Sequence, residues 1–208
     1  MSGTARAVIE VILSYLFKNQ KGRDAKSFYT TPAFASHKEQ TIEVTAPDCG
    51  PSGATLPSEY TYEGGGRFPT LEWRAPGPVA ESVKEWLLVS EDPDAPLSTP
   101  VCHGIYLGIP VAKTRVEAKD FELADPAQRL LKGGFYYGMP RRDVVYMPPR
   151  PLMNHGVHRY FFEVVALSEP LDKEFAKSAA NRDQVAEAIK GKVLGWGMWV
   201  GSSERTWS

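Results

Sequence analysis

The sequence Trp86-Leu-Leu-Val-Ser-Glu-Asp-Pro-Asp-Ala-Pro96 joins an apolar run to a corner rich in acids and prolines. The run Trp86–Ser90 has the composition of a buried β-strand. Proline fixes φ and lacks an N–H donor, so the two prolines hold Asp92 on a rigid corner. An Asx turn that only ends a strand would use the same residue types. The segment alone fits either a structural turn or a functional carboxylate.

A second stretch, Gly156-Val-His-Arg-Tyr160, opens the apolar run Tyr160–Leu167, and the run Val101–Ile109 contains His103. Successive side chains of a strand alternate between faces, so His158 and Tyr160 share one face and Arg159 lies on the other. We predict that these runs and Trp86–Ser90 form the centre of a sheet. A structural histidine at the start of a strand is the alternative interpretation of His158.

The rest of the chain favours a β-rich fold with helices at its ends. Its 208 residues include 18 glycines and 17 prolines, which implies many turns. Thr41–Ala46 and Val193–Trp207 alternate like strands, and Lys113–Arg150 has the composition of long loops. Helices are predicted from Asp172 through Ala179 and, with an Asn181–Gln184 capping box, up to Gly191.

The first forty residues form a separate region, 1–40, ahead of the body at 41–208. An i, i+4 polar stripe (Arg6, Glu10, Ser14, Lys18) predicts a helix over residues 4–18, and residues 19–36 are expected to be a linker. The apolar face is expected to pack on the body, because a wide apolar surface in water favours aggregation. This face comprises Val8, Ile12, Leu13, Leu16 and Phe17. Peripheral contact with a membrane or a partner, and a targeting role, are the alternatives.

Composition and charge exclude several classes of protein. Lys plus Arg is 24 and Asp plus Glu is 25, which argues against a nucleic-acid binder. The sequence contains no apolar run of 18 residues, so we expect no transmembrane segment. Two cysteines, Cys49 and Cys102, are too few for a disulfide-stapled scaffold. Unpaired cysteines are typical of proteins in a reducing compartment, so we expect a cytoplasmic protein.

These features resemble the phosphatidylethanolamine-binding protein (PEBP) family. The resemblance rests on Asp92-Pro-Asp-Ala-Pro96, on His103 eleven residues after Asp92, and on Gly156-Val-His-Arg-Tyr160. Tyr146-x-x-Pro149-x-Pro151 and the order of the intervening pieces are similar to the bacterial and fungal branch, over about residues 41–207. The resemblance implies a mainly β fold, an antiparallel Greek-key β-sandwich with peripheral helices.

The resemblance also implies a small pocket that binds phosphate, a phospholipid headgroup or a similar anion, without catalysis or a cofactor. By motif match, its residues are Asp92, Pro96, His103, His158 and Tyr160. A regulatory role follows from the family, as an inhibitor or scaffold for a kinase or protease. The aromatic residues that often flank the pocket histidine are missing beside His103. The candidates to replace those aromatic walls are Tyr106, Tyr136, Tyr137 and Trp207.

Two other functions fit the same residues. One carboxylate and two histidines could hold a metal for a hydrolase, although no metal-binding motif accompanies them. A pocket for anions could also dock a phosphorylated segment of a partner. For the binding function, we expect Asp92 to orient a histidine, and His103, His158 and the Tyr160 hydroxyl to donate to the anion. Affinity would then weaken as pH rises through the histidine range.

Overall fold

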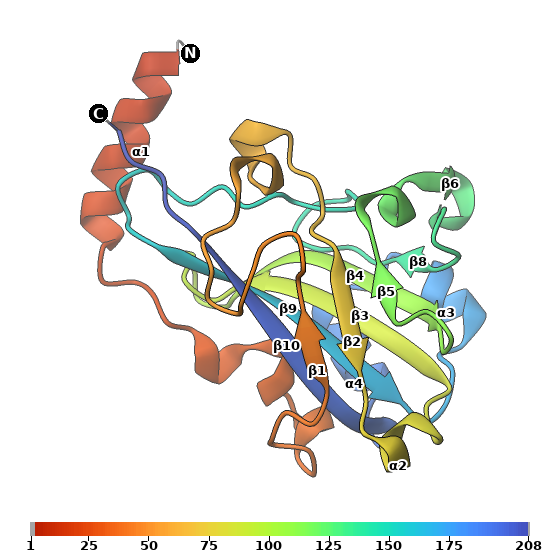
Figure 1. The fold of residues 1–208 in the computed structure, drawn as a ribbon. Helices are drawn as coiled ribbons and strands as arrows, with labels where there is room; N and C mark the ends of the chain where they lie inside the picture. Colours follow the sequence, from red (N-terminus) through yellow and green to blue (C-terminus); the bar gives the residue numbers. More distant parts are fainter. Residues whose placement is uncertain (1–2, 208) are drawn as a thin grey trace.

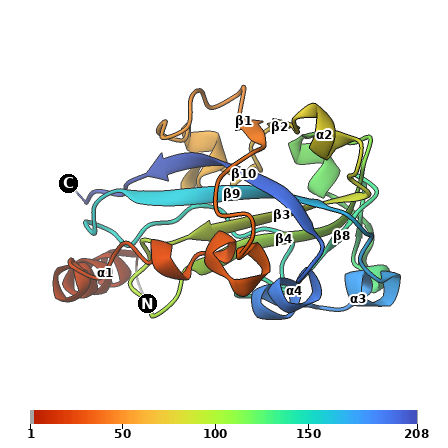
Figure 2. The same ribbon diagram turned by 90° about the horizontal axis from the view of Figure 1, so that it is seen from below.

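The computed structural model describes residues 3–207. The fold is mainly β, with two antiparallel sheets that stack face to face and a third layer of short helices (Figures 1 and 2). The large sheet has the strand order β10-β9-β3-β4-β8-β7-β6, and the small sheet has the order β1-β2-β5. Figure 2 views the large sheet from its edge, with β1 and β2 on one side and α3 and α4 on the other.

The principal predicted strands are present in the structure, and several short strands occur where loops were predicted. The strands are β1 (Glu43–Thr45), β2 (Leu71–Arg74), β3 (Glu85–Asp92), β4 (Val101–Pro110), β5 (Arg115–Val116), β6 (Leu123–Asp125), β7 (Leu130–Leu131), β8 (Tyr136–Tyr137), β9 (His158–Leu167) and β10 (Val193–Ser203). The α-helices are α1 (Gly3–Phe17), α2 (Gly77–Ala80), α3 (Lys173–Lys177) and α4 (Arg182–Ala188). The Asn181–Gln184 capping box of α4 is formed as predicted.

The large sheet is buried on both faces, which explains why the middle of its central strands is predominantly apolar. Trp86 and Leu88 of β3 point into the core between the two sheets, whereas Leu87 and Val89 point into the core beneath the helices. This alternation follows the period of two residues in a strand. Two buried faces therefore give continuous apolar runs rather than alternating ones.

Residues 19–40 are packed against the body and do not form the linker that we expected. Three short 3₁₀ turns lie at Asp24–Lys26, Phe28–Thr30 and Pro32–Phe34. Phe28 and Phe34 are buried in the same core as Trp196 of β10, and Phe34 meets that indole edge to face. The segment covers the outer face of the large sheet beside α4 (Figure 2). Two phenylalanines in a polar stretch were the signal for this packing.

The orientation predicted for the N-terminal helix is wrong. Glu10 and Ser14 of the polar stripe are buried, whereas Ile12 is 54% exposed and Leu16 is 65% exposed. Glu10 turns inward because Arg150 and Arg205 lie beneath it and pair with its carboxylate. Val8 and Leu13 of the expected buried face are also exposed, and Phe17 is half-buried. No helix in residues 3–207 is long and apolar enough to cross a membrane.

Candidate ligand-binding site

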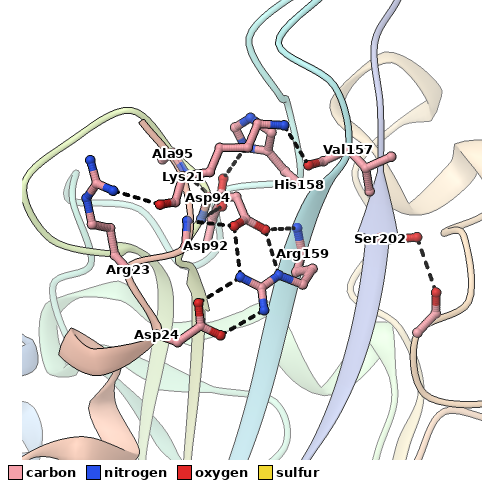
Figure 3. Close-up of polar contacts among 12 residues, drawn as sticks. Lys21, Arg23, Asp24, Asp92, Asp94, Ala95, Val157, His158, Arg159 and Ser202 are labelled. Atoms are coloured by element: carbon pink, nitrogen blue, oxygen red, sulfur yellow. Dashed lines mark hydrogen bonds and ion pairs between the residues drawn. The ribbon is translucent and has the colours of Figure 1, made fainter. Parts of the chain in front are cut away.

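Asp92 is the last residue of β3, and both oxygens of its carboxylate are engaged. Oδ1 accepts hydrogen bonds from the backbone N–H of Asp94 at 2.7 Å and of Ala95 at 3.0 Å, which closes an Asx turn. Oδ2 lies 2.8 Å from Nδ1 of His158 (Figure 3). One oxygen fixes the corner and the other orients an imidazole, so the contact between Asp92 and a histidine that the sequence suggested is present.

His158 is buried at the start of β9, and its second nitrogen is also occupied. Nε2 lies 2.7 Å from Nδ1 of His155, and Nε2 of His155 lies 2.9 Å from the carbonyl oxygen of Phe17. A carbonyl only accepts, so His155 donates through Nε2, and as a neutral ring it accepts through Nδ1 from Nε2 of His158. The Nε2–H group of His158, which we expected to donate to an anion, therefore donates to His155 instead.

His155 was not among the residues that we predicted for the site. The signal for it was a histidine three residues before His158, across Gly156, whose φ of +84° bends the chain back. Burial lowers the pKa of His155, which agrees with a neutral ring that accepts from its neighbour.

His103, on β4, keeps one nitrogen free in the site. Its Nδ1 lies 2.5 Å from the carbonyl oxygen of Met147 and must donate to it. Burial lowers the pKa of His103, and this effect outweighs the nearby carboxylate of Asp92, which raises it. The ring is therefore neutral near pH 7. Within residues 3–207, Nε2 has no hydrogen-bond partner, and in a neutral ring it is a proton acceptor.

Tyr160 stands behind His103 rather than in the cavity. The two rings meet edge to face with centroids 5.2 Å apart. The Tyr160 hydroxyl is buried and has no hydrogen-bond partner in the described part of the chain. Burial raises the pKa of this phenol well above its ordinary value. Tyr160 positions the His103 ring, and its hydroxyl does not line the cavity.

The four remaining predicted residues converge on a cavity of about 280 Å³. Asp92, Pro96, His103 and His158 all line it, together with Glu10, Arg141 and Arg150. Aliphatic and thioether side chains supply the apolar walls. They are Leu97, Val101, Met147, Pro148 and Leu152. None of the four aromatic residues proposed as walls is in this lining, and Tyr106 instead donates to the Val145 carbonyl in the core.

Two guanidinium groups border the cavity, and only one of them is paired. Nη2 of Arg150 lies 2.8 Å from Oε1 of Glu10, whose Oε2 lies 2.8 Å from Nη1 of Arg205. Burial raises the pKa of Glu10, but the hydrogen bonds from Arg150 and Arg205 outweigh it and lower the pKa. The side chain of exposed Arg141 forms no ion pair with any described residue. These residues were missed because no local motif marks them.

Arg159 lies on the opposite face of β9, as predicted, and Asp94 is its partner. Nε and Nη2 of Arg159 bind the two oxygens of Asp94 at 2.8 and 2.9 Å. Nη1 and Nη2 also bind Asp24 at 2.7 and 2.8 Å (Figure 3). The guanidinium ties residues 19–40 to the corner that holds Asp92, and it does not line the cavity.

The described residues contain no group of three His, Cys, Asp or Glu side chains arranged to hold a metal ion. Cys49 and Cys102 are both free thiols. Burial raises the pKa of Cys49 to about 11 and that of Cys102 further, so both remain protonated near pH 7.

Comparison with known proteins identifies relatives of the whole chain. A family model described as "Phosphatidylethanolamine-binding protein" matches residues 47–204. "Phomoidride biosynthesis cluster protein B" of Fungal sp. (strain ATCC 74256) is 44% identical over 202 residues, which cover 96% of both chains. The protein of that name from Talaromyces stipitatus is 43% identical and is covered over 82% of its length, with 96% of this chain matched.

A solved structure supports the fold independently. A putative phosphatidylethanolamine-binding protein homologue from Chlamydia trachomatis superposes with a TM-score of 0.65 and 22% identity. The match covers 80% of this chain and 99% of that one. At this identity the likeness concerns the fold alone. Residues 1–46, which include α1, lie outside the family model, whereas the matches to the two fungal proteins each cover 96% of this chain.

Proposed function

The chain belongs to the phosphatidylethanolamine-binding protein family, and we propose that it binds a small organic anion, a carboxylate or a phosphate ester, in the cavity beside His103. The observation that carries this proposal is Arg141, a guanidinium that lines the cavity beside its apolar walls and forms no ion pair with any described residue. A guanidinium presents several N–H donors in a plane that matches carboxylate and phosphate oxygens. The ligand's charge would meet Arg141, and its carbon skeleton would lie against Pro96, Leu97 and Met147.

The histidines have a different role in this proposal from the one that the sequence suggested. His158 is bonded to Asp92 and His155, and neutral His103 offers an acceptor rather than a donor. Arginine stays charged throughout the physiological pH range. Binding of a phosphodiester should therefore be nearly independent of pH between 6.5 and 8.5, in contrast to the titration that two histidine donors would impose.

Arg141 and its neighbour Arg142 provide a matched pair of variants. Both side chains are exposed, but only Arg141 lines the cavity. A charge-assisted hydrogen bond contributes about 1.5–3 kcal/mol. Arg141→Gln should therefore weaken binding of glycerophosphoethanolamine or succinate about tenfold or more in calorimetry, and Arg142→Gln less than about twofold. Equal affinity of wild type and Arg141→Gln for both probes would refute the proposal.

The names of the fungal relatives favour a ligand from biosynthesis over a kinase or protease partner. A second candidate, proton transfer on a bound intermediate, is favoured by Nε2 of His103, which belongs to a neutral ring and lines the cavity. His103→Gln separates the two functions, because it removes the base and leaves Arg141 in place. Retained binding with loss of the wild-type protein's turnover of a bound compound would identify an enzyme. Retained binding, with no turnover in either the wild type or the variant, would support a binding protein.

A further inference from the structure

Helix α1 lies at the edge of the molecule (Figures 1 and 2), and its outward face is rich in exposed apolar side chains. Six large side chains on it are exposed: Val8, Ile9, Ile12, Leu13, Tyr15 and Leu16. Tyr15 is 72% exposed, and the Lys18 ammonium lies 5.2 Å from the centre of its ring. An exposed apolar face of this kind on a soluble domain marks an interaction site.

Polar contacts hold α1 in this orientation. The Glu10 carboxylate binds Arg150 and Arg205 on the body, and the Phe17 carbonyl accepts from His155. Glu10 is the one acidic residue of α1, and it faces inward. The outward face therefore carries no negative charge, and its apolar side chains remain available while the helix stays docked.

A cluster of cations follows directly after α1: Lys18, Lys21, Arg23 and Lys26. Lys21 donates to the Val157 carbonyl, and Lys26 donates to the Ser98 carbonyl. Arg23 donates to the carbonyls of Leu97 and Lys21. These partners are neutral, so none of the four positive charges is balanced by an ion pair within residues 3–207. Leu97 also lines the cavity, which places the cavity beside the same basic edge.

We propose that the outward face of α1 and the cations at Lys18–Lys26 form a docking surface for an anionic lipid membrane. An interfacial helix buries its apolar side at the boundary between headgroups and acyl chains, and adjacent lysines and arginines attract acidic headgroups. A second copy of the chain is a less suitable partner for this surface. It would supply another set of unpaired cations and no exposed carboxylate from α1. This inference does not depend on what the cavity binds.

The test uses the full chain and vesicles of phosphatidylcholine, with or without about one third phosphatidylserine, in a co-sedimentation assay. We expect binding to the phosphatidylserine vesicles and much weaker binding to phosphatidylcholine alone. Lys18→Gln and Lys26→Gln should each weaken binding roughly fivefold, because a basic residue at such a surface contributes about 1 kcal/mol. Ile12→Glu with Leu16→Glu should abolish it.

The matched control is Val111→Glu with Leu123→Glu. Both residues are exposed apolar side chains outside α1, and Leu123 lies in β6, far from α1 (Figure 1). This variant should bind vesicles like wild type, and both double variants should keep the wild-type unfolding midpoint. Light scattering should show a monomer at the assay concentration. Equal binding to both kinds of vesicle would contradict the proposal. So would a dimer that Ile12→Glu with Leu16→Glu dissociates while vesicles remain unbound.

Discussion

Nε2 of His158 lies 2.7 Å from Nδ1 of His155, and this contact joins the cavity wall to the N-terminal helix. The chain of hydrogen bonds runs from Asp92 through both rings to the Phe17 carbonyl. Its three bonds need three hydrogens, one more than two neutral imidazoles carry. The third hydrogen is shared among the Asp92 carboxyl group and the two rings, so this buried chain is a single hydrogen-bonded unit behind the cavity.

We expect His155→Ala to destabilise the protein and to loosen the end of α1. The substitution leaves an N–H group of His158 buried without a partner, which costs about 1–3 kcal/mol. His155→Gln should recover part of the loss, because an amide can accept and donate as the neutral ring does. Urea unfolding measures the difference, with His37→Ala as the control, since the His37 ring makes no hydrogen bond to a described residue. Equal stability of His155→Ala and His37→Ala would show that the contact contributes nothing.

We expect Glu10→Gln to release α1 from the body. The Glu10 pKa is lowered, so its stabilising effect is complete above the usual glutamate value of about 4.3 and is lost as pH falls through the folded-state pKa. At pH 7 the variant loses two charge-assisted bonds. Amide exchange in residues 3–17 should then be at least about tenfold faster, with β3 and β9 unchanged. Glu81→Gln, at an exposed site after α2, should behave like wild type. Unchanged exchange in α1 would mean that other contacts hold the helix.

Arg159→Met should lower stability without removing the ligand site. The substitution leaves the buried carboxylate of Asp94 with no cation, and Asp24 loses its partner too. Arg159 itself is partly exposed, so the cost should lie between that of a surface pair and that of a buried pair, at about 2–3 kcal/mol. Thermal unfolding and calorimetry on the folded protein measure the two properties. Lost binding with an unchanged melting temperature would place Arg159 in the site after all.

Glu163→Gln should change how stability depends on pH. Burial and the neighbouring Glu91 raise the pKa of Glu163 well above its ordinary value. The contribution of the protonated Glu163 to the free energy of unfolding is fully present below about pH 4.3, the usual glutamate pKa. It is lost as pH rises through the raised folded-state pKa. The variant should therefore gain stability relative to wild type as pH increases from 5 to 8. If the free energies of unfolding of wild type and Glu163→Gln differed by the same amount at every pH in this range, Glu163 would be ionised in the folded protein.

The central sheet was predictable because its strands combine strong local signals. Trp86–Val89 is entirely apolar, and Tyr160–Leu167 is apolar except for the buried Glu163. Strands buried on both faces must have this composition. The position of Arg159 away from the cavity was predictable from strand alternation, which places it on the face opposite His158.

The orientation of α1 was not predictable from its own residues. An amphipathic pattern indicates two faces, but the surface beneath the helix decides which one is buried. Here that surface presents Arg150 and Arg205, which are distant in sequence, and their charges outweigh the apolar face. The charged lining of the cavity was missed on the same grounds, because Arg141 and Arg150 lie in irregular segments that carry no local motif.

The contact between Glu10 and Arg205 has a consequence for synthesis of the chain. The two residues are 195 positions apart, so this ion pair can form only after almost the whole polypeptide has been made. At about 5–20 residues per second, the ribosome needs roughly 10–40 seconds to reach Arg205 after Glu10. Throughout this interval the nascent helix lacks its complete set of partners, and its apolar side chains are accessible to chaperones and membranes in the cell.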